Sequence, residues 1–168
     1  VKVFQIADPN AAGKKVTGYC DTEEKQYNPF LLTWLGKEDS DKALAALKEN
    51  DFFIAIGDNA VREKIFRKLA EKNLHPVNAI HPSAVIDPSA NLAPNGIMVA
   101  ANAVINPLAK IGVGAICNTS CIIEHECIVG DFAHIGPGAV LCGNVKVGNN
   151  TFVGANAVVR QGITIGNN

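Results

Sequence analysis

The sequence predicts a chain of two parts: a small α/β domain with a parallel sheet over residues 1–78, followed by a parallel β-helix over residues 79–168. Three observations predict it. The sequence repeats every six residues after position 79, and the first part alternates strand-like with helix-like segments. The composition, with 48% hydrophobic and 18% charged residues, is typical of a globular protein, and 168 residues make one or two small domains.

The first part contains four segments that read as strand, helix, strand and helix. Residues 15–21 (KVTGYCD) alternate apolar and polar side chains, and residues 39–50 carry apolar residues at helical spacing. Residues 52–56 (FFIAI) are a short apolar run typical of a buried strand, and residues 60–73 have the pattern of an amphipathic helix. This alternation predicts a small parallel sheet.

Ligands of such sheets bind at the carboxyl ends of the strands. Asp21 ends the first predicted strand, and the loop Gly57-Asp58-Asn59 follows the second. These are the candidate ligand positions of the first part, although a loop of this composition is also common as a simple turn.

The second part is a hexapeptide repeat. An aliphatic residue or Cys occupies one slot of every hexapeptide from Ile80 to Ile165, and each spacing is six except the seven residues from Leu92 to Val99. One large and one small residue per hexapeptide would fill a narrow three-sided prism, while Gly and Asn tolerate the backbone angles at its corners. Three hexapeptides complete one coil, so residues 18 apart stack and pair as parallel strands about 4.8 Å apart.

One corner of this repeat carries reactive side chains where the others carry mostly Gly, Pro, Asn or Ala. It holds Glu124, His125 and Glu126, and His134 follows shortly after. A histidine flanked by carboxylates suits general-base catalysis, because a carboxylate orients the ring and stabilises the imidazolium. A mechanical solenoid or an ice-binding rod would have nearly uniform faces, so we interpret this corner as catalytic.

The repeat also predicts what lies one coil above this corner. Gly143 follows His125 by 18 residues, and Gln161 follows Gly143 by 18. A glycine lets a thioester approach the backbone, and its N–H could hold the acyl oxygen. Gly143, its neighbour Cys142 and Gln161 are therefore the candidate cofactor-binding residues, along a track for a pantetheine arm.

Charge and cysteine usage narrow the function further. The net charge of −1 offers no basic surface for nucleic acid, and no apolar run approaches the roughly 20 residues that cross a membrane. No signal peptide is visible. Cys117, Cys121 and Cys127 occupy apolar slots of the repeat without a CxxC pair, so we expect buried thiols and a cytoplasmic protein.

The motifs resemble those of bacterial hexapeptide-repeat sugar acetyltransferases, most strongly the UDP-4-amino-sugar N-acetyltransferases of bacillosamine biosynthesis. The resemblance is carried by residues 118–134 (NTSCIIEHECIVGDFAH), 142–148 (CGNVKVG), 51–59 (DFFIAIGDN) and 80–84 (IHPSA). It covers residues 51–166 well and residues 1–50 poorly. Sialic-acid O-acetyltransferase-like and GDP-perosamine N-acetyltransferase branches share the architecture, so O-acetylation and a GDP-linked sugar remain alternatives.

This resemblance implies a left-handed coil and a homotrimer with active sites between neighbouring prisms. It implies acetyl-CoA as the co-substrate, a UDP-linked amino sugar as the acceptor and no metal. His125 would be the base, supported by Glu126, and the amide of Gly143 would meet the acetyl group. The remaining implied contacts are with the substrate: Asn118 and His134 in the same site, and Asp21, Gly57 and Asn59 on the nucleotide.

Two departures from the family concern the ends of the sequence. Family members open with a strand and a Gly-rich phosphate loop, whereas Val1-Lys2-Val3-Phe4 reads like the helix that follows this loop. The last residues, Gly166-Asn167-Asn168, stop in mid-repeat. We therefore expect a natural protein with a further strand and loop before residue 1 and further coils after residue 168.

Two other function classes remain to be weighed. The γ-type carbonic anhydrases use the same prism with three His ligands on zinc, but here only His125 and His134 are close in sequence, and His81 lies more than two coils away. A nucleotide-sugar-binding module without catalysis is the other alternative. The Glu-His-Glu corner favours an enzyme, since a pure binding protein has no use for a base there.

Overall fold

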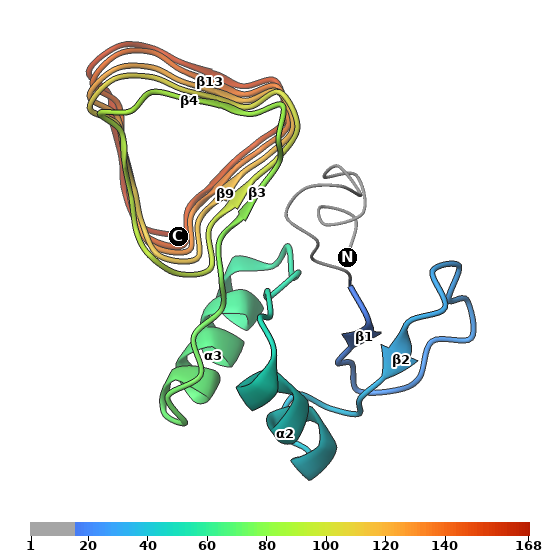
Figure 1. Cartoon of the computed structure of the whole chain (residues 1–168). Helices are drawn as coiled ribbons and strands as arrows, with labels where there is room; N and C mark the ends of the chain where they lie inside the picture. The colour runs from blue at the N-terminus through green and yellow to red at the C-terminus, as the bar shows by residue number, and fades with distance from the viewer. Residues whose placement is uncertain (1–15) are drawn as a thin grey trace.

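The computed structural model describes residues 16–168 and consists of a three-sided prism with a small domain against one of its edges (Figure 1). The prism is a left-handed β-helix, as predicted. Each coil contributes one two-residue strand to each of three parallel sheets. The strands are β3 (Ala79–Ile80), β4 (Val85–Ile86), β5 (Asn91–Leu92), β6 (Met98–Val99), β7 (Val104–Ile105), β8 (Lys110–Ile111), β9 (Ile116–Cys117), β10 (Ile122–Ile123), β11 (Ile128–Val129), β12 (His134–Ile135), β13 (Val140–Leu141), β14 (Lys146–Val147), β15 (Phe152–Val153), β16 (Val158–Val159) and β17 (Thr164–Ile165).

We name the three sheets by their surroundings. The domain-side sheet contains β3, β6, β9, β12 and β15 and faces the small domain. The aliphatic sheet contains β4, β7, β10, β13 and β16, and lies along the top of the prism in Figure 1. The third sheet contains β5, β8, β11, β14 and β17.

The register follows the repeat. Strand partners are 18 residues apart along most of the prism, as in Ile122 opposite Val140, whereas Ala79 pairs with Met98, 19 residues on. The extra residue lies in the seven-residue spacing before Val99, where Gly96 adopts a φ of +74° beside the small domain. The single seven-residue spacing in the sequence therefore corresponds to a corner with one additional residue, which lies against this domain.

The repeat residues fill the prism as predicted. Large side chains such as Ile123 and Leu141 alternate inside it with small ones, and Cys117, Cys121 and Cys127 are fully buried among them. The contact with Cys121, together with burial, raises the pKa of the Cys117 thiol. These cysteines therefore act as small apolar residues, as the sequence indicated.

The small domain contains β1 (Gly18–Tyr19), β2 (Thr33–Trp34), α2 (Asp41–Glu49) and α3 (Asn59–Ala70). Both predicted helices are present. Each begins at a side-chain cap, where Ser40 accepts the N–H of Ala43 and Asp58 accepts that of Val61.

The strand predictions in this domain were correct only in part. Residues 15–21 contain β1, but its parallel partner is β2, which the sequence reading missed, so the order is strand, strand, helix, helix. Residues 52–56 carry no strand in the described part of the chain. Ile54 is nevertheless buried against Leu69 and Leu74. The apolar run therefore predicted burial correctly, but it did not predict strand pairing. The helix expected at residues 1–4 lies outside the described residues.

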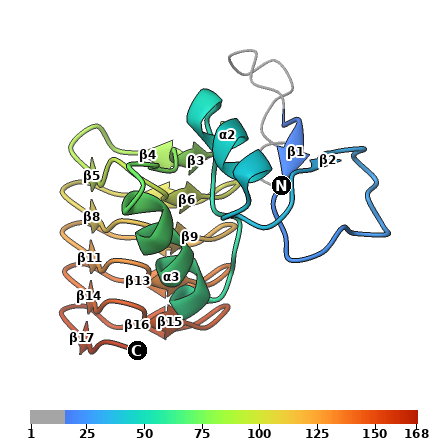
Figure 2. The same ribbon diagram turned by 90° about the horizontal axis from the view of Figure 1, so that it is seen from below.

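The small domain meets the prism along α3, which runs beside the stacked coils (Figure 2). The rings of Phe66 and Phe132 pack edge to face with centroids 5.4 Å apart. Among residues 16–168, no helix is both long and apolar enough to cross a membrane.

Candidate active site

His125 lies at the corner of the prism that follows the aliphatic sheet. Its Nδ1 is 3.1 Å from Glu126 Oε2, and both side chains are more than half exposed. A carboxylate at Nδ1 holds a proton there, which leaves Nε2 as the nitrogen that can accept a proton from a substrate. Glu126 reaches this position from a left-handed backbone conformation with a φ of +61°.

Gly143 lies against the His125 ring, one coil farther along the prism. A Cβ atom at position 143 would be 2.5 Å from His125 Nε2 and 2.6 Å from Cε1. The N–H of Asn144 donates to the His125 carbonyl at 2.9 Å, which fixes the stacking of the two coils. The sequence prediction that residues 125 and 143 share a corner is confirmed, and the unbound ring nitrogen is the part of the ring nearest to Gly143.

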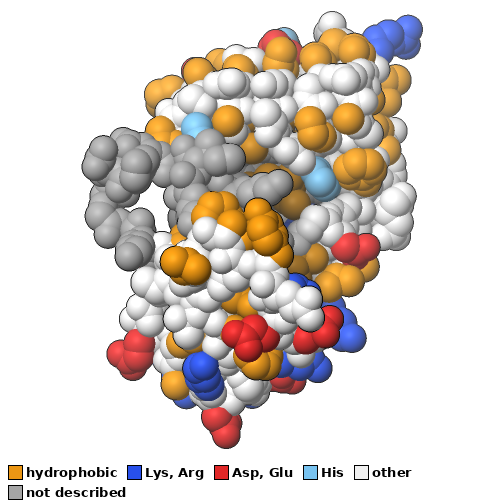
Figure 3. All heavy atoms as spheres, turned by 90° about the vertical axis from the view of Figure 1, so that its right-hand side faces the viewer, with side chains coloured by type: hydrophobic (Ala, Val, Ile, Leu, Met, Phe, Trp, Pro, Cys, Tyr) orange, Lys and Arg blue, Asp and Glu red, His pale blue; other side chains and the backbone are white. Residues whose placement is uncertain are grey.

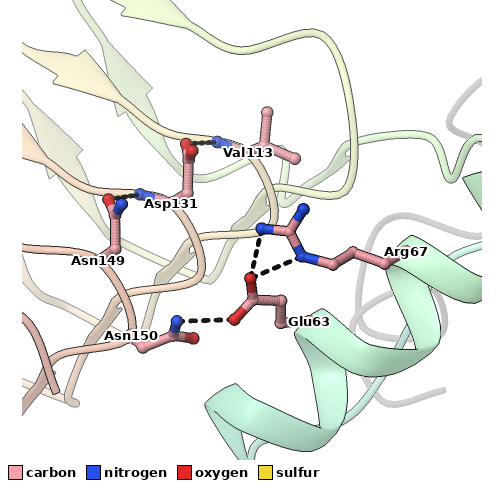
Figure 4. Close-up of polar contacts among 6 residues, drawn as sticks. All are labelled: Glu63, Arg67, Val113, Asp131, Asn149 and Asn150. Carbon is pink, nitrogen blue, oxygen red and sulfur yellow. Dashed lines mark hydrogen bonds and ion pairs between the residues drawn. The ribbon is translucent and has the colours of Figure 1, made fainter.

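The backbone N–H of Gly143 differs from its equivalents at the corner that faces α3. There the N–H groups of Val113 and Asp131 donate to the side chains of Asp131 and Asn149, one coil on, at 2.9 Å each (Figure 4). At the His125 corner, the N–H of Gly143 has no hydrogen-bond acceptor within residues 16–168. It is therefore a free donor beside the basic nitrogen.

The other two candidate cofactor residues lie in or beside the same column. Cys142 is half-buried, and its carbonyl accepts the Cys127 thiol at 3.2 Å. Gln161 is exposed one coil above Gly143, whose carbonyl accepts the Gly162 N–H at 3.0 Å. The column predicted from the repeat is thus an open edge of the prism with the reactive corner partway along it.

A second group of candidate residues lines a cavity of about 520 Å³ between the small domain and the prism. Its domain wall is residues 53–57, and its prism wall includes Met98, Ile116, Asn118 and His134. Figure 3 shows this side of the molecule, where hydrophobic side chains and histidines lie on the prism next to the small domain. The cavity brings Gly57, Asn118 and His134 together, and His81 also lines it.

The His134 ring is held in one orientation in this cavity. Asn118 Oδ1 accepts the Thr119 N–H at 2.8 Å, so its Nδ2 is the atom that faces His134 Nε2, at 2.9 Å. Nε2 therefore accepts, Nδ1 carries the proton, and the ring hydrogen-bonds to the backbone of Gly57.

The protonation state of His134 is set by its surroundings. Burial lowers the pKa of His134, the positive charge of Arg62 lowers it further, and the Gly57 hydrogen bond acts in the opposite direction. The His134 and Phe152 rings also pack in a T-shaped arrangement, with centroids 4.9 Å apart. The His134 ring is thus neutral at neutral pH.

Two predicted ligand residues are engaged elsewhere. Asn59 Nδ2 donates to the Asn150 carbonyl at 2.7 Å and its Oδ1 accepts from Arg62, so its amide joins α3 to the prism. Asp21 forms an ion pair with Lys25 at 3.1 Å and does not line the cavity. No three His, Cys, Asp or Glu side chains within residues 16–168 are grouped to hold a metal ion.

The residue that sequence reasoning missed is Arg62. It is 1% exposed and lies on the apolar face of α3, seven residues before the buried Leu69. A charged residue in an apolar slot of an amphipathic helix was the available signal.

Comparison with known proteins gives concordant relatives. Residues 3–69 match the PglD N-terminal domain family. GDP-perosamine N-acetyltransferase of Escherichia coli O157:H7 is 26% identical over 158 residues, which are 94% of this chain, and the chain spans 64% of the length of that curated relative.

Two solved structures share the fold over nearly the whole chain. A variant of perosamine N-acetyltransferase from Caulobacter crescentus, in complex with CoA and GDP-perosamine, is 32% identical with a TM-score of 0.79, covering 96% of this chain and 84% of that one. The acetyltransferase domain of PglB from Neisseria gonorrhoeae FA1090, in complex with acetyl coenzyme A, is 29% identical with a TM-score of 0.81, covering 96% and 78%.

Proposed function

The chain belongs to the bacterial hexapeptide-repeat sugar N-acetyltransferases, and we propose that it transfers an acetyl group from acetyl-CoA to the 4-amino group of a nucleotide-linked amino-dideoxy sugar. The observation that carries this proposal is the pair formed by His125 Nε2 and the Gly143 backbone. A free base and a free N–H donor lie together at an open corner, which is the minimum set for acyl transfer to an amine.

The proposed reaction is direct attack on the thioester. As the sugar amine bonds to the acetyl carbon, it passes a proton to His125 Nε2, and Glu126 stabilises the resulting imidazolium through Nδ1. The Gly143 N–H stabilises the oxyanion that develops on the acetyl oxygen. Breakage of the carbon–sulfur bond then releases the CoA thiolate, which takes up the proton. No side chain is acylated in this scheme, so Cys142 has no nucleophilic role.

The nucleotide sugar is proposed to occupy the cavity of Gly57, Asn118 and His134. The second N–H of the Asn118 amide can donate to a sugar or phosphate oxygen, whereas both nitrogens of the neutral His134 ring are engaged with Asn118 and Gly57, so this ring shapes the cavity. A Cβ atom at Gly57 would have no atom of residues 16–168 within 4 Å. Motif resemblance favours a UDP-linked sugar. The alternative is a GDP-linked sugar, because two of the relatives are named for GDP-perosamine.

A homotrimer would bring the candidate base His125 close to the candidate substrate cavity. In one chain, the His125 corner and the Asn118 corner lie at opposite ends of the aliphatic sheet, so a single prism does not place the base at the cavity. The outer face of this sheet is a column of aliphatic residues, and its end members Val85 and Val158 are 61% and 71% exposed. We propose that neighbouring prisms pack on this face, so that His125 of one chain serves the cavity of another.

A turnover assay on the full natural protein tests the proposal. Release of the CoA thiol is measured with acetyl-CoA and a panel of UDP- and GDP-linked 4-amino sugars, with the matching 4-hydroxy sugars as controls. We expect turnover only with amines, and its loss in His125→Ala. Acetylation of the hydroxyl sugars would favour an O-acetyltransferase, and tight binding of a nucleotide sugar without turnover would favour a binding module.

A further inference from the structure

Arg62 is a buried cation with no carboxylate in contact among residues 16–168. A guanidinium has five N–H donors, and each of those of Arg62 has its own acceptor. Nε donates to Gly114 O at 2.8 Å. The four remaining bonds are from Nη1 to Ile56 O and Gly57 O at 3.0 Å each, and from Nη2 to Asn59 Oδ1 at 2.7 Å and Phe132 O at 2.6 Å.

These acceptors lie in the domain wall of the candidate substrate cavity and at a corner of the prism outside this cavity. Gly114 and Phe132 belong to the corner of the prism that faces α3, whereas Ile56 and Gly57 form the domain wall of the cavity. The guanidinium therefore joins this wall to the prism through backbone carbonyls. A simple packing role would need no such set, because an apolar side chain of similar volume would fill the same space without the cost of burying a charge.

The bonds continue from Arg62 to the substrate-facing ring. The Gly57 carbonyl accepts from Arg62, and the His134 ring bonds to the backbone of the same residue. Because Nε2 accepts from Asn118, Nδ1 carries the ring proton, so the ring donates and the carbonyl is the acceptor of the Gly57 backbone. The next member of the chain is Asn118, whose Nδ2 faces His134 Nε2 at 2.9 Å.

We propose that Arg62 is a positioning residue for the acceptor substrate: its guanidinium fixes the Ile56–Gly57 wall against the prism and, through the Gly57 carbonyl, orients the His134 ring toward Asn118. The part of this inference that concerns substrate binding rests on the proposed function. The part that concerns the orientation of the His134 ring does not depend on the proposed function.

The charge of Arg62 has a separate effect on the ring. Burial lowers the pKa of Arg62 to about 10, with Asp58 acting in the opposite direction, so the guanidinium stays charged at neutral pH. Among residues 16–168, the charge that acts on His134 is that of Arg62, which is itself near Asp58, and His81 lines the same cavity from the prism. Removal of the charge should therefore raise the pKa of His134.

The test compares Arg62→Met, Arg62→Lys and the control Arg67→Met in the full-length protein. Arg67 lies on the same helix but is exposed, and its ion pair with Glu63 is at the surface. NMR of ¹⁵N-labelled histidine reports the tautomer and pKa of His134, and steady-state kinetics report KM for each substrate. In Arg62→Met we expect a higher pKa of His134, loss of the single Nδ1–H tautomer, and KM for the nucleotide sugar raised by about tenfold, with KM for acetyl-CoA within about twofold. Arg67→Met should match the wild type.

Arg62→Lys separates the effect of the positive charge from the effect of the five hydrogen bonds. Lysine keeps the charge but cannot make the five bonds, so the pKa of His134 should stay low while KM for the nucleotide sugar rises. This variant also decides the case if Arg62→Met does not fold, since an unchanged KM in Arg62→Lys would overturn the inference.

A folded Arg62→Met with unchanged His134 titration, tautomer and KM would also overturn the inference, even if its Tm fell, because Arg62 would then be only a structural link. Failure of the wild type to acetylate any nucleotide sugar would count against the proposed function instead. The NMR arm needs no substrate and would still test Arg62.

Discussion

A single added methyl group at position 143 should disable the candidate base without unfolding the protein. The φ of Gly143 lies outside the left-handed region, so alanine can adopt its backbone conformation. The new Cβ would, however, be 2.5 Å from His125 Nε2, and ordinary contact begins at 3.4 Å, so the ring must retreat by about 0.9 Å. Within its own chain the His125 side chain is 54% exposed and can rotate away from Gly143, which makes displacement of the ring cheaper than distortion of the coil.

The expected loss follows from this displacement. Misplacement of a reacting group by about 1 Å can reduce the rate by about a hundredfold, which corresponds to about 2.7 kcal/mol of transition-state stabilisation. We therefore expect kcat of Gly143→Ala to fall about a hundredfold with little change in Tm. The control is Gly154→Ala, another glycine of the prism without a left-handed φ, whose Cβ would have no atom of residues 16–168 within 4 Å. It should behave as the wild type.

A double-mutant cycle separates the ring from the acetyl group. In a His125→Ala background the added methyl group has no ring to displace, so Gly143→Ala should lower kcat little further if it acts through His125. A full additional loss, with weaker acetyl-CoA binding by calorimetry, would mean that the methyl group obstructs the acetyl group itself. Near wild-type turnover of the single variant Gly143→Ala would refute the stacked corner as the reactive site.

Three further predictions concern the base, the buried ring and the assembly. His125→Ala should lower kcat by about a hundredfold or more while sedimentation and Tm stay unchanged, and normal turnover would remove the residue from the mechanism. Because burial lowers the pKa of His134 below its ordinary 6.5, the unfolded chain binds a proton that the folded chain does not once the pH falls through 6.5, so stability must decrease there. Accordingly, Tm should fall less between about pH 7.5 and 5.5 in His134→Gln than in the wild type, and equal slopes would contradict the assignment. Val140→Glu places a charge on the outer face of the aliphatic sheet, so we expect monomers in sedimentation velocity and loss of turnover, whereas an intact, active trimer would show that this face is not the interface.

The prism was predictable from the sequence to the level of single contacts. A repeat of six fixes which residues stack, so the position of Gly143 one coil on from His125 followed from counting, and the structure confirms it. The small domain lacks such a constraint. β2 is only two residues long, and its partner is set by packing, which leaves no periodic signal for Thr33 and Trp34.

The polar residues of the small domain show why candidate sites on it were harder to assign. Gly57 and Asn59 flank the N-cap of α3, and in the sequence both fit a ligand-binding loop after an apolar run. The Asn59 amide instead bonds to the Asn150 carbonyl, 91 residues away, while Gly57 faces the cavity and its carbonyl links Arg62 to His134. A polar residue that connects two domains and one that binds a ligand can have the same local sequence pattern. Only a hydrogen-bond partner far away in the sequence distinguishes them. In this protein the distinction depends on Arg62, whose five acceptors come from α3, the loop before it and the prism, so the shape of the candidate substrate cavity depends on a residue that cannot itself reach the substrate.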